Sequence, residues 1–162
     1  MTRNPFAGFM TAIASSLAIM SGQVTTGETG TSDRFVLVME GAAVRDNKTG
    51  LIWEREPDSF HGVWSDANPH CLEKTVGGRK GWRAPTVEEL ASLVDQSQHD
   101  PALPAGHPFS NVKSAIYWTT TPSLKDPITA WHVSFLSGEV MTDQKSQTRR
   151  VWCVRASAES GP

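Results

Sequence analysis

The stretch from Gly77 to Leu90, GGRKGWRAPTVEEL, constrains this chain more than any other part of its sequence. Its three glycines permit backbone conformations that other residues avoid, and Trp82 supplies a large apolar anchor next to them. Thr86 and Glu89 stand at the spacing of a capping box, in which each side chain accepts a hydrogen bond from the other residue's backbone N–H. The stretch therefore predicts a glycine-rich loop, held by a tryptophan and followed at once by a short helix.

Short strands and two short helices are predicted along the chain. Runs of β-forming residues and period-two alternation mark the strands, and apolar residues at helical spacing mark the second helix. Strands are expected at 35–39, 43–46, 51–54, 116–121, 130–135, 139–142 and 149–155, and helices at 64–72 and 87–94. The turn residues 47–50 predict a hairpin, with Gly50 available for positive φ. Strands, two helices and then antiparallel strands make one domain of the α+β class.

Two further details of these elements follow from residue chemistry. Pro69 lacks an N–H and is tolerated in the first turn of a helix, so we expect Asp66 to cap the first helix. In the strand at 130–135, the large apolar side chains alternate onto one buried face: Trp131, Val133 and Phe135. His132 falls between them, so we expect it to be exposed.

The N-terminal residues carry the features of a secretory signal. Arg3 precedes an apolar stretch of small residues that is too short for a membrane span and suits a signal peptide. An N-terminal helix of the mature domain is the alternative. We assign residues 1–22 to a signal peptide, 23–34 to a flexible linker, 35–157 to the domain and 158–162 to a disordered tail. The mature chain is then expected in the periplasm or outside the cell, with no membrane span.

The two cysteines, Cys71 and Cys153, are predicted to form one disulfide. In an oxidising compartment a single pair most simply oxidises to a bridge, and this bridge would close a long loop. The alternatives are two buried thiols or half of a metal site.

Charge and tryptophan content bear on the class of partner. The formal net charge of −2 favours neither nucleic acid nor an anionic membrane surface as a partner. Six tryptophans are spread over the predicted elements and indicate a tryptophan-rich core. The alternative is that one or two of them line a sugar-stacking surface.

No motif for catalysis or metal binding is present. The histidines, at 61, 70, 99, 107 and 132, show no zinc-ligand spacing, and the loop aspartates, at 95, 100, 126 and 143, show no calcium-ligand spacing. Gly-x-Ser-x-Gly is missing, and a disulfide would consume both thiols. We therefore expect a protein that is not an enzyme and needs no cofactor.

An ordered set of pieces between residues 35 and 157 resembles the Lcl C-terminal domain family, named for the C-terminal domain of a bacterial collagen-like adhesin. The matching pieces are VRDNKTGLIW at 44–53, Trp64 with Ala67 and Cys71, GG at 77–78, GWRAPT at 81–86, EL at 89–90, YWTTT at 117–121, AWHV at 130–133 with Phe135 and Gly138, and VWCVR at 151–155. Ala84, where the family usually has Leu, and Pro69 in the first helix are departures. The resemblance implies a C-type-lectin-like fold, with two short helices against antiparallel sheets and a disulfide from the first helix to the last strand.

The candidate ligand-binding residues are basic: Lys125, Lys145, Arg149 and Arg150. Guanidinium groups suit sulfate and carboxylate, so these residues predict a site for a sulfated or acidic glycan, on loops 119–126 and 143–150. The resemblance points the same way, because the adhesin's domain is associated with sulfated glycosaminoglycans. The alternative for the residues is a solvated face. We therefore expect an exported, non-catalytic binding module of the cell envelope, or else a structural or assembly subunit that binds an envelope protein.

Overall fold

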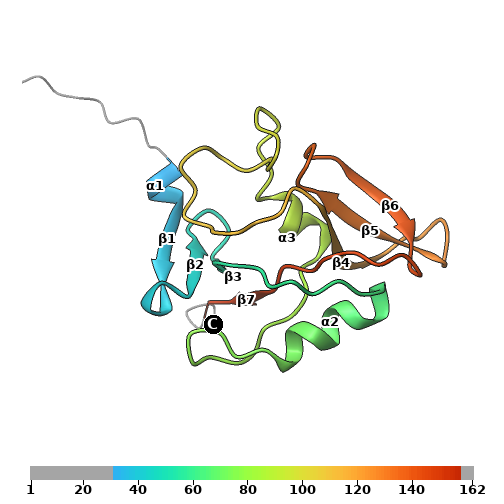
Figure 1. Ribbon diagram of the computed structural model, residues 1–162, viewed down its shortest axis with the longest axis horizontal. Coiled ribbons are helices and arrows are strands. Elements are labelled where there is room, and N and C mark those ends of the chain that lie inside the picture. Colours follow the sequence, from blue (N-terminus) through green and yellow to red (C-terminus); the bar gives the residue numbers. More distant parts are fainter. Residues whose placement is uncertain (1–30, 158–162) are drawn as a thin grey trace, which may run out of the picture.

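The computed structural model describes residues 31–157, which fold into short elements joined by long, ordered connections (Figure 1). The elements are α1 (Thr31–Arg34), β1 (Phe35–Val38), the 3-10 turn η1 (Met39–Gly41), β2 (Ala43–Asp46), β3 (Leu51–Glu54), α2 (Trp64–Glu73), α3 (Val87–Ala91), β4 (Ile116–Pro122), β5 (Thr129–Ser134), β6 (Val140–Gln144) and β7 (Val154–Ala156). The predicted signal peptide and C-terminal tail lie outside the described residues.

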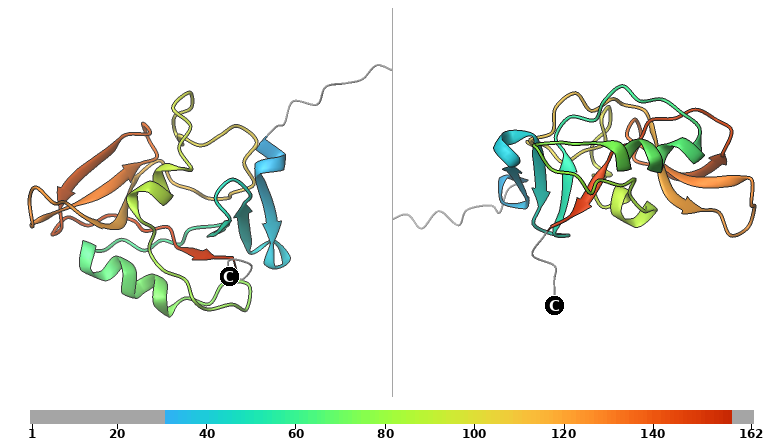
Figure 2. Two further views of the ribbon diagram at one scale, coloured as in Figure 1. Left: turned by 180° about the vertical axis from the view of Figure 1, so that it is seen from behind. Right: turned by 90° about the horizontal axis from the view of Figure 1, so that it is seen from below.

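The strands form two antiparallel sheets. One has the order β1-β2-β3-β7 and the other the order β4-β5-β6. Figures 1 and 2 show the two sheets at opposite ends of the molecule, with α3 between them and α2 along one side. The chain is thus an α+β protein with two antiparallel sheets, few helices and one disulfide, which confirms the predicted fold class at that level.

The predicted hairpin joins β2 to β3. Gly50 adopts a φ of 73°, and Asp46 lies opposite Leu51 in the register. The Asp46 carboxylate accepts two hydrogen bonds from the guanidinium of Arg34, at 3.0 and 2.8 Å. Burial opposes ionisation of Asp46, but these bonds outweigh it and hold its pKa below the usual value. Arg34 belongs to the helical turn α1, which falls within the range 23–34 assigned to a linker.

Helix α3 begins with the predicted capping box. The Thr86 hydroxyl accepts from the N–H of Glu89 at 3.3 Å, and the Glu89 carboxylate accepts from the N–H of Thr86 at 2.8 Å. The helix ends at Ala91 rather than at 94. The Ser92 hydroxyl donates to the carbonyl of Glu89, and the backbone N–H groups of the next two residues bond to the carbonyls three positions earlier. Leu90, at its centre, is fully buried.

Helix α2 differs from the prediction at its start. It begins at Trp64 after Val63, which makes no side-chain cap, so Asp66 is not the cap. Pro69 therefore lies in the helix interior, where its missing N–H leaves the Ser65 carbonyl without a helical partner. Both Ser65 and Pro69 are exposed, so water can hydrogen-bond this carbonyl.

The predicted disulfide is present and lies in the core. Cys71 of α2 and Cys153 are bridged, with their Cα atoms 5.5 Å apart and a sequence separation of 82. Both are fully buried. The bridge connects α2 to the segment that leads into β7.

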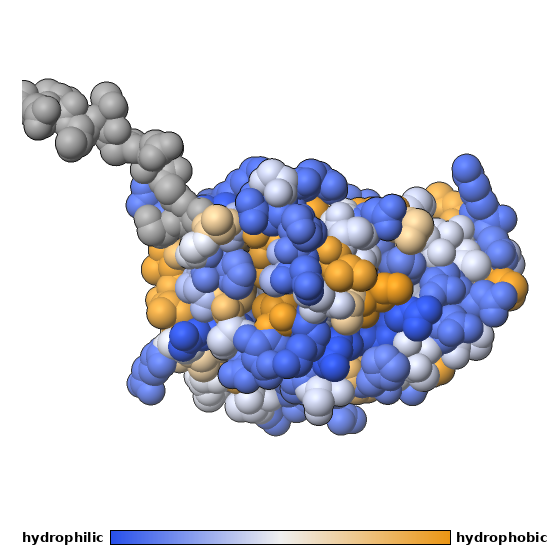
Figure 3. Space-filling model, turned by 45° about the horizontal axis from the view of Figure 1, so that its top comes forward, coloured by the Kyte–Doolittle hydropathy of each residue, from blue (hydrophilic) through white to orange (hydrophobic). Residues whose placement is uncertain are grey.

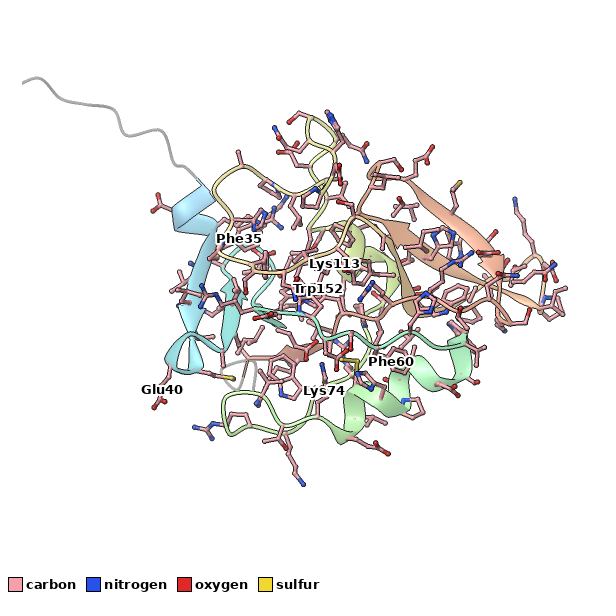
Figure 4. The ribbon with its side chains drawn as sticks, in the orientation of Figure 1. Phe35, Glu40, Phe60, Lys74, Lys113 and Trp152 are labelled. Carbon is pink, nitrogen blue, oxygen red and sulfur yellow. A yellow bond between two sulfur atoms is a disulfide. The ribbon has the colours of Figure 1, made fainter. Side chains whose placement is uncertain are left out.

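The core is rich in tryptophan, as predicted. Four tryptophans have no exposed surface: Trp53, Trp82, Trp118 and Trp152. Trp152 lies near the middle of the molecule in Figure 4 and packs edge-on against Trp53, Phe109 and Phe135. Trp64 and Trp131 remain partly exposed. The prediction that Trp131 lies on a buried face is therefore only partly met.

His132 is buried, not exposed as the alternation predicted. Its exposed fraction is 2%, and its ring lies edge-on against Trp118. The reason is that both faces of β5 are covered: Val133 lies on the face that packs on α3, and His132 lies on the face of Trp118. A period of two distinguishes buried from exposed residues only where one face of a sheet meets solvent.

The predicted last strand at 149–155 is divided between the two sheets, and we call residues 149–156 the seam segment. At its start, Arg150 hydrogen-bonds along β4, accepting from the N–H of Trp118 at 2.8 Å. At its end, Val154 pairs with Trp53 of β3, and only Val154–Ala156 form the strand β7. The seam segment thereby joins the two sheets and fixes the positions of Arg149 and Arg150.

Candidate ligand-binding surface

Two of the four predicted basic residues lie on one hollow at the start of the seam segment. Backbone hydrogen bonds hold them there: Arg149 exchanges bonds of 2.9 and 3.0 Å with Gly62, and the Arg150 N–H donates to the carbonyl of Ile116 at 3.1 Å. The hollow has a volume of about 350 Å³. Its lining consists of His61, Ser114, Ala115, Ile116, Ser134, Leu136, Arg149 and Arg150. We call it the arginine hollow.

No carboxylate lines the arginine hollow, but one lies just behind it. Asp143 of β6 accepts from the Arg149 guanidinium at 2.5 Å and so orients it. The Nε of Arg149 is buried and finds no partner within residues 31–157. The Arg150 guanidinium makes one long bond, 3.4 Å, to the carbonyl of Asp58. Arg149 also donates to the carbonyl of Thr148 at 2.9 Å, so the donors that remain for a ligand are mainly those of Arg150.

The two lysines of the prediction lie elsewhere. Lys145 donates to the carbonyl of Pro127 at 2.8 Å, and its ammonium stands 4.5 Å from the centre of the Trp64 ring. Its charge thus stabilises local structure by hydrogen bonding and a cation–π contact. Lys125 is exposed at the tip of the β4–β5 hairpin. The four residues do not converge on a single site.

Trp131 stands between two further hollows on the α3 side of the three-stranded sheet. One, of about 490 Å³, is lined mainly by apolar side chains from α3 and the strands: Val87, Ala91, Pro122, Leu124, Trp131 and Val140, with Glu88 and Thr121. We call it the Trp131 groove. The other, of about 450 Å³, is lined by Lys125, Asp126 and hydroxyl residues in addition to Trp131 and Leu124. The half-buried Trp131 was not predicted as a site residue.

The comparison with known families agrees with this architecture. Residues 42–155, which run from just before β2 into β7 and include the disulfide and all three hollows, match the Lcl C-terminal domain. The chain belongs to the Lcl C-terminal domain family. A search among curated proteins found no significant match. The family resemblance stated from the sequence pieces is confirmed.

A network of charged side chains in this Lcl C-terminal domain was missed by the sequence analysis. Lys74, which caps the C-terminal end of α2, binds Glu54 of β3 and stands 2.9 Å from Asp58 (Figure 4). His70 is 2.9 Å from the same Asp58 oxygen, and its ring stacks on Phe60 at 4.1 Å. The two carboxylates lie 12 to 20 positions before the His70 and Lys74 side chains that they bind, so only the packing of α2 brings the pairs together.

Burial and hydrogen bonding shift the pKa values of the two carboxylates in this network. Burial raises the pKa of Glu54, although hydrogen bonds from Lys74 and the Cys153 N–H work in the opposite direction. Burial acts on Asp58 as well, but there the hydrogen bonds from Lys74 and Phe60 prevail and lower the pKa. The network satisfies its own charges, so we interpret it as structural.

Neither metal ligation nor membrane insertion is indicated in the described part of this Lcl C-terminal domain. Residues 31–157 contain no group of three or more His, Cys, Asp or Glu side chains that could hold a metal ion. Over the same range, the helices are too short or too polar to cross a bilayer.

Proposed function

We propose that this Lcl C-terminal domain is an exported, non-catalytic binding module of the cell envelope with a C-type-lectin-like fold. Its ligand is a sulfated or acidic glycan, which binds in the arginine hollow. Export is supported by the buried disulfide, since such bonds persist in oxidising compartments. The bridge from α2 to the end of the chain supports the C-type-lectin-like assignment.

One observation carries the choice of ligand: two guanidinium groups line a hollow that has no carboxylate in its wall, and one of them, that of Arg150, makes a single long hydrogen bond of 3.4 Å. The planar fork of arginine binds two oxygens of a sulfate or carboxylate at once. Ile116 and Leu136 add apolar surface beside the arginines, suited to the C–H face of a sugar ring. A local site of this kind needs no strongly basic protein, which agrees with the net charge of −2.

The proposal of a binding protein rather than an enzyme rests on how the ionisable residues are used. The densest group of them, Glu54, Asp58, His70 and Lys74, is paired within itself. The Glu54 side chain is also buried, and it lines none of the hollows described above. These residues support α2 and the disulfide, and we assign them no chemical step.

The test measures binding of the mature domain to heparin and to chemically desulfated heparin. Arg150→Gln removes one guanidinium of the hollow without leaving a buried carboxylate unpaired. We expect it to weaken heparin binding about tenfold or more, the range for a charge-assisted hydrogen bond. Arg79→Gln removes the same charge from an exposed loop outside the hollow and should change binding less than about twofold. Equal losses in both variants, or no heparin binding by the unmodified domain, would overturn the proposed site.

A second candidate function is a structural or assembly subunit that binds an envelope protein. It is favoured by apolar side chains exposed around the β4–β5 hairpin and β6: Leu124 at 99%, Ile128 at 61% and Met141 at 46%. Exposed apolar groups of this kind, gathered at one end of a molecule, mark protein contact surfaces. Figure 3 shows that apolar patches on the visible face are broken up by polar residues. Lys125 and Asp126 lie between Leu124 and Ile128 in the same hairpin, so such a contact is expected to combine apolar and polar recognition.

A further inference from the structure

Strand β6 is the outermost strand of the three-stranded sheet, with β5 on one side only. Two backbone bonds at its ends define the pairing: Lys145 N–H donates to Ile128 at 2.9 Å, and Ser134 N–H donates to Glu139 at 2.9 Å. In an antiparallel pair, hydrogen-bonded and non-hydrogen-bonded positions alternate. The pairing of every residue in β6 follows from these two bonds.

Met141 and Asp143 direct their N–H and C=O groups to β5, and Val140 and Thr142 direct theirs outward. Within residues 31–157, no backbone hydrogen bond is made by these outward groups of Val140 and Thr142. The next outward N–H, that of Gln144, is satisfied at 2.8 Å by the Asp143 carboxylate. The open edge is therefore the stretch from Val140 to Thr142.

Two of the other three sheet edges are covered. The outer edge of β4 binds the seam segment through Trp118 and Arg150, and β7 exchanges bonds of 2.9 Å with Arg83. The third, the outer edge of β1, is only four residues long and ends where Met39 and Glu40 adopt positive φ values. Proteins protect exposed edges with lysine, proline or bulges, and β6, with the sequence VMTDQ, has neither residue type nor a bulge in its pairing with β5.

The Trp131 groove lies next to this open edge. Thr142 is paired with Trp131, and Val140 with Val133, so both outward residues of β6 share the face of the groove. Val140 is also one of the residues that line it. A strand added beside β6 would place alternate side chains on this same face, within reach of the groove.

Charge disfavours one pairing of two copies and favours a partner strand with a basic residue. Two β6 strands paired antiparallel about Met141 would place Asp143 directly opposite Glu139 of the second copy, and like charges in that position are destabilising. Glu139 is exposed, and Glu88 lines the groove. These carboxylates favour an incoming strand that carries a lysine or arginine.

We infer that the open edge of β6 binds an extended segment of a partner protein as a fourth strand. The segment has apolar residues at alternate positions, facing the Trp131 groove, and a basic residue that meets Glu88 or Glu139. Main-chain bonds to Val140 and Thr142 supply affinity, and the groove supplies selectivity. This surface and partner class go beyond the proposed function, since neither involves the arginine hollow or a glycan.

The test selects binders from a random ten-residue peptide library displayed on phage, with the mature domain as the target. Synthetic copies of the enriched peptides are then bound to the domain and followed by amide hydrogen exchange in NMR. We expect enriched peptides to alternate apolar residues and to contain lysine or arginine. We expect the amides of Val140 and Thr142 to gain at least tenfold protection, because free edge amides become hydrogen-bonded.

Two variants at one position isolate the main-chain contribution. Thr142→Pro removes an outward N–H that β5 does not use, and should abolish peptide binding. Thr142→Ala keeps the N–H and should bind as the unmodified domain does. An unchanged circular dichroism spectrum and an unchanged urea midpoint would show that Thr142→Pro is folded. If Thr142→Pro is unfolded, two other variants replace it: Val140→Gln on the groove face and Met141→Gln on the opposite face. Only Val140→Gln should then weaken peptide binding.

Several results would overturn the inference. The first is that no peptide is enriched. The second is that Thr142→Pro and Thr142→Ala bind peptide equally well. The third is that peptide binding does not slow hydrogen exchange of the Val140 and Thr142 amides. A dimer in sedimentation that Thr142→Pro dissolves would also overturn it, because the occupant would then be a second copy. Failure of the heparin test leaves all these results unaffected, so the two proposals are judged separately.

Discussion

Glu54 accepts a hydrogen bond of 3.0 Å from the backbone N–H of Cys153, one of the two disulfide cysteines. Its other carboxylate oxygen binds the Lys74 ammonium, and its backbone carbonyl accepts from the Trp152 indole at 2.9 Å. One buried residue thus connects β3, the C-terminal end of α2 and the seam segment. The same seam segment carries Arg149 and Arg150, so the proposed binding site depends on this connection.

Replacing Lys74 with methionine is predicted to destabilise the domain strongly. The change leaves the buried Glu54 carboxylate without its cation, and breaking a buried ion pair costs about 3–5 kcal/mol. We expect a loss near the lower figure, since Lys74 keeps some contact with solvent. Urea denaturation measures the free energy of unfolding. Lys80→Met, at an exposed position, is the matched control and should change it by less than about 0.5 kcal/mol.

Removal of the disulfide is predicted to lower stability without changing the fold at moderate temperature. The bridge joins residues 82 positions apart, for which the chain-entropy model gives about 4.5 kcal/mol. The double variant Cys71→Ala with Cys153→Ala should therefore unfold at lower urea concentration than the oxidised domain. Adding a reductant to the unmodified domain should shift it to the same midpoint, and a variant that unfolds as the oxidised domain does would contradict the expectation.

Stability is predicted to fall at acid pH in part through Glu89. Hydrogen bonds from Arg83 at 2.7 and 2.6 Å and from the Thr86 N–H lower its pKa below 4.5, although burial opposes them. A lowered folded-state pKa means stability that is present above the unfolded value and is lost as the pH falls through the folded value. Glu89→Gln should therefore reduce the loss of unfolding free energy measured between about pH 6 and pH 3. Glutamine can still complete the capping box, and an unchanged pH profile would argue against the assignment.

Asp143→Asn is predicted to tighten heparin binding by the arginine hollow. The carboxylate now neutralises Arg149 at 2.5 Å, and its removal would leave that guanidinium free for the ligand. We expect an affinity gain of about two- to fivefold at low salt, which shrinks as salt screens the charges. Titration calorimetry at two salt concentrations measures both effects. Glu139→Gln, a change of the same size at an exposed neighbouring position, should give a smaller gain.

Much of the fold could be predicted from local patterns. The capping box at Thr86 and Glu89, the hairpin with Gly50 and the presence of a disulfide depend on residues whose chemistry permits few alternatives. Where the predictions differ from the structure, long-range packing is the cause. His132 is buried because both faces of β5 are covered, and Pro69 lies inside α2 because the exposed face of the helix tolerates it.

The candidate site could be predicted only in part, for a reason visible in its residues. Arg149 and Arg150 are adjacent in sequence and line the same hollow. His61 lines it as well, because the neighbouring Gly62 pairs with Arg149 through backbone hydrogen bonds, and these two residues are more than eighty positions apart. Lys125 and Lys145 looked equivalent to the arginines as charges, yet one lies on another hollow and the other is held by Pro127 and Trp64. Charge in a sequence does not show which atoms are already bound.

The sequence by itself determined the family, the α+β class, the tryptophan core and the cysteine pair, because apolar periodicity, turn chemistry and thiol oxidation act locally or on the chain as a whole. The tertiary structure alone decided which charges remain available and which strand edge remains open. The division of the seam segment between two sheets places Arg149 and Arg150 on their hollow, and the position of β6 at the end of the sheet order leaves Val140 and Thr142 unpaired. Both outcomes depend on contacts between residues far apart in the chain, which no local pattern encodes.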